Sequence, residues 1–204
     1  MSQLFRLHNF DIHKLVHELV AIGAASVPLL SEDFRLALLL EAASYSYIPE
    51  AEIVGKGNQT VRQQMSSFAD FPRFTLYRQL RSAFQNLLDE HLTAVTSYPF
   101  ATKLNFNTMV LQKYELGSLG ITPHRDRSSY INLACIFTIG GQGKFYLCDD
   151  RCGSNAQAID SHPGSVLFLR APGFMNSPQR PFHYVNEIQS VRYTYGLRQT
   201  ATAC

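Results

Sequence analysis

The chain has 204 residues, which suits a single domain, and its hydrophobic fraction of 46% is ordinary for a globular core. Charged residues make up only 17% and the formal net charge is +2, a balance that does not favour strong nucleic-acid binding. The sequence shows no recognisable signal peptide and no apolar run long enough to cross a bilayer, so we expect a cytoplasmic protein without a membrane partner.

The first hundred residues carry mainly helical patterns. Apolar residues at helical spacing predict an amphipathic helix over 11–22. Ser31 is a candidate N-cap for a second helix, which should end near Ser44. A third helix is expected to begin near Asp70, with Pro72 in its first turn.

The segment 45–71 separates the second and third predicted helices. Glycine and asparagine at 55–58 interrupt regular structure there. One interpretation is an ordinary surface connection. The other is a lid over a substrate, because loops of this length are often active-site lids.

The second half changes to the two-residue period of β-strands. We expect strands over 104–110, 130–139, 144–148, 165–169, 182–185 and 191–199. The glycine-rich turn at 140–143 predicts a hairpin between the second and third of these strands. Many short strands with glycine and proline turns favour a jelly roll over a parallel sheet. The predicted fold is therefore mainly β with N-terminal helices (α+β): one domain over 1–204, helical over 1–100, with a jelly-roll core over 101–200.

Cysteines and spare histidines offer only weak metal motifs. Cys148 and Cys152 would need two further ligands to form a zinc site, so a surface loop with reduced thiols is the competing interpretation. Cys135 lies in an apolar run and is expected in the core. His13 and His17 can share one helix face, but no acidic residue completes a known motif, which favours a solvated face.

Three other residues form a stronger candidate metal site: His124, Asp126 and His183. On a strand, His124 and Asp126 would point to one side and Arg125 to the other. The third ligand can come from a distant strand, although His183 alone is also consistent with a core or surface histidine. Two imidazoles and one carboxylate can cap one face of an iron(II) ion and leave its other positions open.

The last predicted strand places polar side chains on one face. Arg192, Thr194, Gly196 and Arg198 share that face by the two-residue period. Two guanidinium groups on one face repel each other and lose solvation unless an acidic group lies between them. A dianion such as 2-oxoglutarate would fill that role, because arginine binds a carboxylate bidentately. The alternative is two exposed arginines on an edge strand.

These motifs resemble the iron(II)- and 2-oxoglutarate-dependent oxygenase superfamily, whose core is a double-stranded β-helix, a form of jelly roll. The chain is similar to the AlkB-like branch, which carries Asn-x-Tyr ahead of His-x-Asp and ends its core on Arg-x-Asn-x-Thr-x-Arg. Here the corresponding stretches are Gln112-Lys113-Tyr114, His124-Arg125-Asp126 and Arg192-Tyr193-Thr194-Tyr195-Gly196-Leu197-Arg198. The resemblance covers about residues 104–200, and Gln112, Thr194 and Gly196 depart from the pattern of the branch.

The resemblance implies a role for each matched position. His124, Asp126 and His183 would bind Fe(II). Tyr114 and Arg192 would hold the distal carboxylate of 2-oxoglutarate, and Arg198 would lie near its metal-chelating end. The substituted positions Gln112 and Thr194 would line the same cosubstrate site.

The implied activity is hydroxylation or demethylation of an organic substrate with O2, coupled to decarboxylation of 2-oxoglutarate to succinate. The substrate would be a small molecule, a peptide side chain or a methylated nucleobase. An AlkB-like nucleic-acid demethylase would need stacking aromatics and a cationic groove. Candidates for these are Tyr45, Tyr47, Phe68, Phe71 and Arg73, although such aromatics are equally consistent with a core.

Two other function classes share the same metal ligands. A jelly-roll metal-binding or sensing protein without turnover would not need Arg192 and Arg198, so the arginine pair argues against it. A zinc hydrolase would need a general base beside the metal, and no residue of the sequence stands out for that role.

Overall fold

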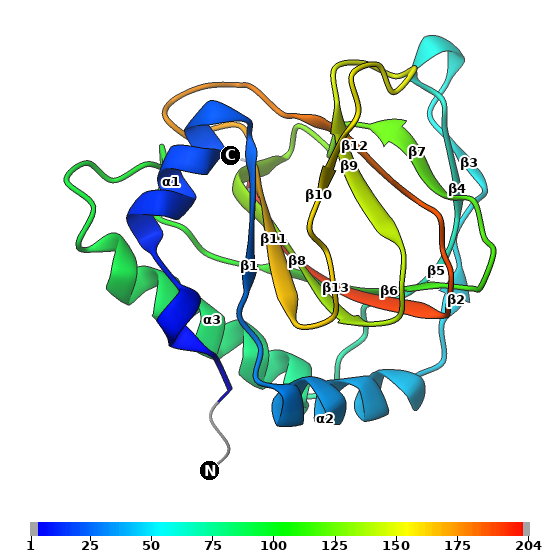
Figure 1. The fold of residues 1–204 in the computed structure, drawn as a ribbon, viewed down its shortest axis with the longest axis horizontal. Helices are drawn as coiled ribbons and strands as arrows, with labels where there is room; N and C mark the ends of the chain where they lie inside the picture. Colours follow the sequence, from blue (N-terminus) through cyan, green and yellow to red (C-terminus); the bar gives the residue numbers. More distant parts are fainter. Residues whose placement is uncertain (1–3, 202–204) are drawn as a thin grey trace.

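The computed structural model describes residues 4–201, and Figure 1 shows two facing β-sheets with helices outside one of them. The seven-stranded sheet runs in the order β1 (Ala24–Pro28), β11 (Ser165–Arg170), β8 (Tyr130–Gly140), β13 (Arg192–Thr200), β6 (Thr108–Tyr114), β5 (Ser66–Phe68) and β2 (Ile48–Pro49). The six-stranded sheet runs in the order β10 (Gln157–Ile159), β9 (Lys144–Cys148), β12 (Phe182–Asn186), β7 (Gly120–His124), β4 (Val61–Gln64) and β3 (Ile53–Val54). This is the predicted jelly roll.

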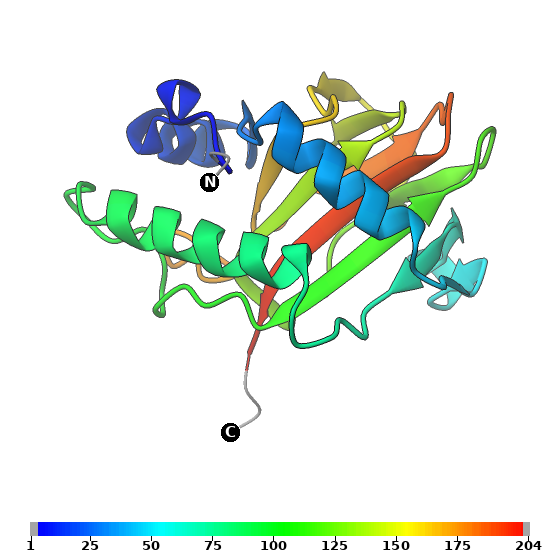
Figure 2. The same cartoon turned by 90° about the horizontal axis from the view of Figure 1, so that it is seen from below.

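The helices are α1 (Ile12–Ala21), α2 (Glu32–Ala43) and α3 (Leu76–Leu92), with short 3-10 turns at Leu7–Asn9 and Gly57–Gln59. Figure 2 shows α2 and α3 lying across the outer face of the seven-stranded sheet. The predicted first and second helices are confirmed. Asp11 caps α1 by accepting the backbone N–H groups of His13 and Lys14, and Ser31 caps α2 through the N–H of Phe34.

The third helix begins at Leu76, so the predicted start near Asp70 is wrong. Thr75 is the N-cap and accepts the backbone N–H of Arg78 at 3.1 Å. The Arg78 guanidinium also binds the carbonyl oxygens of Phe71 and Pro72. These carbonyls are therefore satisfied by a side chain, and the helical ladder starts only after them.

Two apolar clusters hold the layers together. Between the helices and the seven-stranded sheet, Phe84 of α3 meets Phe137 at 4.9 Å and Phe168 at 5.9 Å between ring centroids. Between the two sheets, a smaller cluster includes Phe145 and Val185. The space between the sheets also holds polar side chains, and that is where the predicted site residues lie.

The alternation predicted for the last strand is confirmed in β13. Tyr195 and Leu197 pack into the cluster under the helices. Arg192 and Thr194 instead line a cavity between the sheets, and Arg198 reaches Asp126 in the same interior. One strand therefore contributes to the core on one side and to the site on the other.

The first hundred residues contain strands that the helical pattern did not predict. β1 pairs with β11 at one edge of the seven-stranded sheet. In the segment 45–71, β5 pairs with β6 and β4 pairs with β7, so this segment extends both sheets. These strands are only two to five residues long, which is too short to give a clear periodic signal.

Two strand predictions in the second half also need correction. The turn at 140–143 does not form a hairpin, because β8 and β9 belong to different sheets and the chain crosses between them there. Residues 104–107 precede β6 rather than starting it. The backbone N–H of Asn105 binds the Gln199 side chain and that of Phe106 binds the Gln85 side chain, so neither joins a sheet.

A membrane-spanning helix would need a long apolar stretch. Within residues 4–201, none of the helices meets that requirement.

Candidate metal centre

The structure brings the three predicted metal ligands together. His124 ends β7 and pairs in register with His183 of β12, with their ring centroids 4.4 Å apart. Asp126 follows two residues later, and potential ligand atoms of all three side chains lie within 4.8 Å of one another. This is the one group of three or more metal-binding side chains found among the described residues.

The local backbone differs from the prediction in one respect. β7 stops at His124, so Asp126 lies in the loop that follows instead of on the strand. Arg125 still points elsewhere, with its guanidinium 4.0 Å from the ring centroid of Phe182. The side chains of His124 and Asp126 therefore meet at one point, although one residue ends a strand and the other lies in a loop.

Backbone carbonyls orient both imidazoles. Nδ1 of His124 lies 2.9 Å from the carbonyl oxygen of Thr122, and Nδ1 of His183 lies 3.2 Å from that of Pro181. An Nδ1–H that donates to these carbonyls leaves Nε2 of each ring free to bind a metal. Phe145 stacks on His183 with 5.4 Å between ring centroids, which further fixes that ring.

The charge states of the three side chains suit a divalent metal. Burial lowers the pKa of His183 to about 3, and burial also lowers the pKa of His124, so both are neutral at pH 7. Burial alone would raise the pKa of Asp126, but the positive charge of Arg198 is the main cause that brings it down to about 2, and the hydrogen bond from Arg198 adds to this effect. Two neutral nitrogen donors and one carboxylate result, which is the donor set of a non-haem iron(II) site.

Arg198 contacts the metal-ligand group directly. Its Nε lies 3.3 Å from Oδ2 of Asp126, and its guanidinium lies 5.3 Å from the ring centroid of Tyr130. Gly196 makes room for this placement, because a Cβ at that position would lie 2.5 Å from Nη1 of Arg198. Gly196, where the AlkB-like branch carries threonine, thus leaves free the space that the Arg198 guanidinium occupies.

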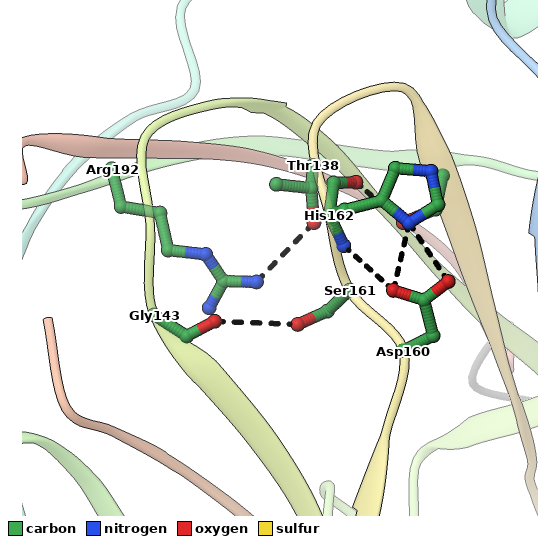
Figure 3. Close-up of polar contacts among 7 residues, drawn as sticks. Thr138, Gly143, Asp160, Ser161, His162 and Arg192 are labelled. Carbon is green, nitrogen blue, oxygen red and sulfur yellow. Dashed lines mark hydrogen bonds and ion pairs between the residues drawn. The ribbon is translucent and has the colours of Figure 1, made fainter. Parts of the chain in front are cut away.

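Arg192 lies deeper, in a small cavity between the sheets. Part of the cavity wall is apolar, and its polar part is formed by Gln112, Tyr114, Thr138, Ser161, Arg192 and Thr194. Figure 3 shows the Arg192 guanidinium directed toward Thr138, whose Oγ1 accepts a hydrogen bond from Nη2 at 3.2 Å. Nε and Nη1 of Arg192 are buried without a hydrogen-bond partner, and only 1% of the residue is exposed.

A buried guanidinium without an acidic partner is costly. The effective penalty for removing an ion from water is several kcal/mol, and it is offset only by a counter-charge with good geometry. None of the ion pairs among the described residues involves Arg192, and burial lowers its pKa. The cavity therefore fits an anionic group that enters from outside the chain.

The remaining predicted cosubstrate residues lie around the same cavity. Tyr114 pairs in register with Arg192, and burial raises its pKa to about 12, so its phenol stays protonated and can donate a hydrogen bond. Gln112 faces Thr194, with 3.5 Å between Oε1 and Oγ1. Gln112 also lines the wide cleft that contains His124 and Asp126, so cavity and cleft adjoin.

Three residues near the site had no signal in the sequence. Thr138 and Ser161 contribute hydroxyl groups to the cavity, and Arg180 donates from Nη1 to the backbone carbonyl of Asp126. Thr138 lies in an apolar run, and the other two lie in segments without periodicity. Only the folded arrangement reveals them.

Among residues 4–201, the structure does not bring further metal-binding side chains to the cysteine pair or to the histidine pair of the first helix. Cys148 donates its thiol to the carbonyl oxygen of Asp150, and Cys152 is exposed. Neither belongs to a group of three metal-binding side chains in the part of the chain that the structure describes. His13 and His17 are exposed on α1, as the solvated-face interpretation predicted, and Cys135 is buried as expected.

Comparison with known proteins supports the fold at low sequence identity. No family model and no curated protein matches this chain. Among solved structures, a prolyl-4-hydroxylase from Pseudomonas putida matches with a TM-score of 0.64 and 13% identity, over 93% of this chain and 98% of that chain. An oxidoreductase of the 2OG-Fe(II) oxygenase family from Burkholderia pseudomallei matches with a TM-score of 0.58 and 14% identity, over 98% and 95%.

A structure of OsALKBH1 also matches, with a TM-score of 0.58 and 15% identity, over 87% of this chain and 98% of that chain. At these identities the likeness concerns the fold. The chain has the double-stranded β-helix fold of these oxygenase structures, as the sequence resemblance implied.

Proposed function

We propose that this protein is a non-haem iron(II), 2-oxoglutarate-dependent dioxygenase that hydroxylates or demethylates an organic substrate. The observation that carries the proposal is the buried Arg192, whose Nε and Nη1 have no partner in the same interior that holds the His124, Asp126 and His183 group. A metal-binding or sensing protein without turnover would not need this buried, uncompensated cation.

In this proposal the triad holds Fe(II). His124 and His183 present Nε2, and Asp126 contributes a carboxylate oxygen and part of the charge balance. The carbonyl oxygens of Thr122 and Pro181 keep both rings in position. A set of two imidazoles and one carboxylate leaves positions open for a cosubstrate and O2.

Arg192 and Tyr114 would bind the distal carboxylate of 2-oxoglutarate. The free Nε and Nη1 of Arg192 can donate to that carboxylate, and the protonated phenol of Tyr114 can donate as well. Arg198 would lie near the opposite end of the cosubstrate, beside Asp126. Thr194 and Gln112 would line the space between these ends.

The bound iron and cosubstrate would supply the oxidation itself. Per turnover, 2-oxoglutarate, O2 and a C–H bond give succinate, CO2 and a C–OH group; a hydroxylated N-methyl group would then leave as formaldehyde. The chain contributes positioning and exclusion of water. Phe145 against His183 and the apolar walls of the cavity serve that purpose.

The segment 45–71 would close over the substrate as part of a single oxygenase domain spanning 1–204. Val54, Gly55, Asn58 and Gln59 of this segment line the cleft that contains His124 and Asp126. Tyr45 stacks on Phe68 with 4.1 Å between ring centroids, and Phe71 meets both rings edge-on. These rings therefore anchor the segment, which leaves nucleobase stacking to other residues.

The direct test is calorimetric titration of 2-oxoglutarate into protein loaded with Mn(II), which accepts the same ligands. We expect 1:1 binding by the wild type and at least roughly tenfold weaker binding by Arg192→Gln, because two charge-assisted hydrogen bonds are lost. Arg73→Gln is the control, since Arg73 is exposed over Phe74 outside the cleft. Equal affinity in all three proteins would refute the assignment of Arg192.

A further inference from the structure

The cleft that contains His124 and Asp126 is lined by several arginines that have no acidic partner within residues 4–201. Arg125, Arg127 and Arg151 line it, and none of them has a carboxylate partner among the ion pairs of the described residues. The two carboxylates that line the cleft are engaged elsewhere. Glu50 accepts a hydrogen bond from Ser67, and Asp126 binds Arg198.

Two of these arginines converge on one aromatic ring. The guanidinium carbon of Arg125 lies 4.0 Å from the ring centroid of Phe182, and that of Arg151 lies 5.7 Å from the same centroid. Phe182 directly precedes His183, a candidate metal ligand. On β12 the side chain of Phe182 points to the opposite face from that of His183, but the cleft lined by Phe182 and the two arginines is also lined by His124 and Asp126.

Arg151 also has an unsatisfied donor. Its Nη1 is buried and has no hydrogen-bond partner. A buried donor without an acceptor is unfavourable, and a second guanidinium nearby increases the cost by charge repulsion. An anionic group that reaches both guanidinium groups would relieve both effects.

Two other arginines of the cleft already have partners, and Arg127 is exposed to solvent. Arg180 donates to the carbonyl oxygen of Asp126, and Arg198 pairs with its carboxylate. Of the three arginines without a carboxylate partner in the described part of the chain, Arg125 and Arg151 therefore lie together at Phe182. Nucleic-acid binding usually needs cations distributed along a groove that follows the phosphates, so this arrangement fits one anionic group better than a polyanion.

We propose that the substrate is an organic acid whose carboxylate or phosphate group binds Arg125 and Arg151 beside Phe182. This assignment rests on the proposed dioxygenase function, because it places the anion of the substrate next to the metal ligands. Charge-assisted, bidentate hydrogen bonds from the guanidinium groups would fix the orientation of the substrate. The acid would enter through the cleft rather than through the inner cavity of Arg192.

The test uses inorganic phosphate and acetate as probes at constant ionic strength. Each is titrated into the full-length protein while the side-chain Nε–H resonances of arginine are followed by NMR. We expect saturable shifts in the wild type and at least roughly tenfold weaker binding of one probe in both Arg125→Gln and Arg151→Gln. The tighter probe identifies the anion as phosphate or carboxylate. Arg73→Gln, a matched arginine over Phe74, should bind as the wild type does.

Three results would overturn the assignment. The variants could bind both probes like the wild type, or affinity could fall only in Arg192→Gln, which would place the anion in the inner cavity. A single-stranded oligonucleotide could also bind far more tightly than either probe, with a steep dependence on salt.

The titration of 2-oxoglutarate into Mn(II)-loaded protein separates the two proposals. If that binding is absent but phosphate or acetate still depends on Arg151, the dioxygenase function fails while the anion site stands.

Discussion

The guanidinium of Arg198 lies 3.3 Å from the carboxylate of Asp126, and their side chains are only 10% and 17% exposed. In this mostly buried pair, the charge of Arg198 overcomes the effect of burial and holds the pKa of Asp126 at about 2. The pair therefore keeps the Asp126 carboxylate ionised although its burial favours the neutral form.

Replacement of Arg198 should destabilise the metal-free protein. We expect Arg198→Gln to lower the free energy of unfolding by about 3 kcal/mol at pH 7, because it leaves the Asp126 carboxylate buried without its partner. The lowered pKa of Asp126 contributes stability above pH 4 that is lost as the pH falls toward 2, so the difference between the proteins should shrink over that range. Chemical denaturation measures both effects. The double variant Asp126→Asn/Arg198→Gln should regain part of the loss.

Replacement of Arg192 should have the opposite effect on stability. Arg192→Met removes a buried charge that has no acidic partner, so we expect the free energy of unfolding without cosubstrate to rise by about 1–3 kcal/mol. Saturating 2-oxoglutarate should stabilise the metal-loaded wild type but not this variant. A variant that loses stability and still responds to 2-oxoglutarate would contradict the role given to Arg192.

The stability of the metal-free protein should depend on pH through His183. Its pKa is about 3 in the folded state, against about 6.5 for an ordinary histidine, so the unfolded chain takes up a proton first as the pH falls. This group alone should lower the free energy of unfolding by about 2 kcal/mol between pH 7 and pH 5. The comparison with His183→Asn isolates this contribution. An unchanged pH dependence in that variant would show that His183 is not the cause.

Gly196 should be required for the position of Arg198. A Cβ at residue 196 would lie 2.5 Å from Nη1 of Arg198, so Gly196→Thr should push this side chain away from Asp126. We expect 2-oxoglutarate to bind several-fold more weakly and the pKa of Asp126 to rise, which carboxyl NMR can follow. Gly196→Ala should cause a similar but smaller change. Wild-type values in both variants would show that Arg198 adapts without cost.

Strand periodicity predicted the part of the site that lies on β13. The alternation of Arg192, Thr194 and Arg198 with Tyr195 and Leu197 is local, so the sequence alone separates the face toward the site from the face toward the helices. The same logic paired His124 with Asp126, although Asp126 lies in a loop. The contact of His124 with His183 depends on the pairing of β7 with β12, which local patterns do not encode.

Residues outside periodic segments could not be predicted. Arg151 and Arg180 reach the cleft from irregular segments, and their placement depends on contacts with Phe182 and Asp126. The strands of segment 45–71 could not be predicted either, because they are only two to four residues long and depend on pairing with β6 and β7. Long-range pairing, not local propensity, makes these residues strands.

The most direct test of the central claim is spectroscopic. Under anaerobic conditions, Fe(II) and 2-oxoglutarate are added to the metal-free protein, and the visible metal-to-ligand charge-transfer band is recorded. The proposed function predicts a band in the wild type that disappears in His183→Ala and Arg192→Ala. Iron binding without this band, or a band that persists in both variants, would contradict the assignment of this interior as an iron and 2-oxoglutarate site.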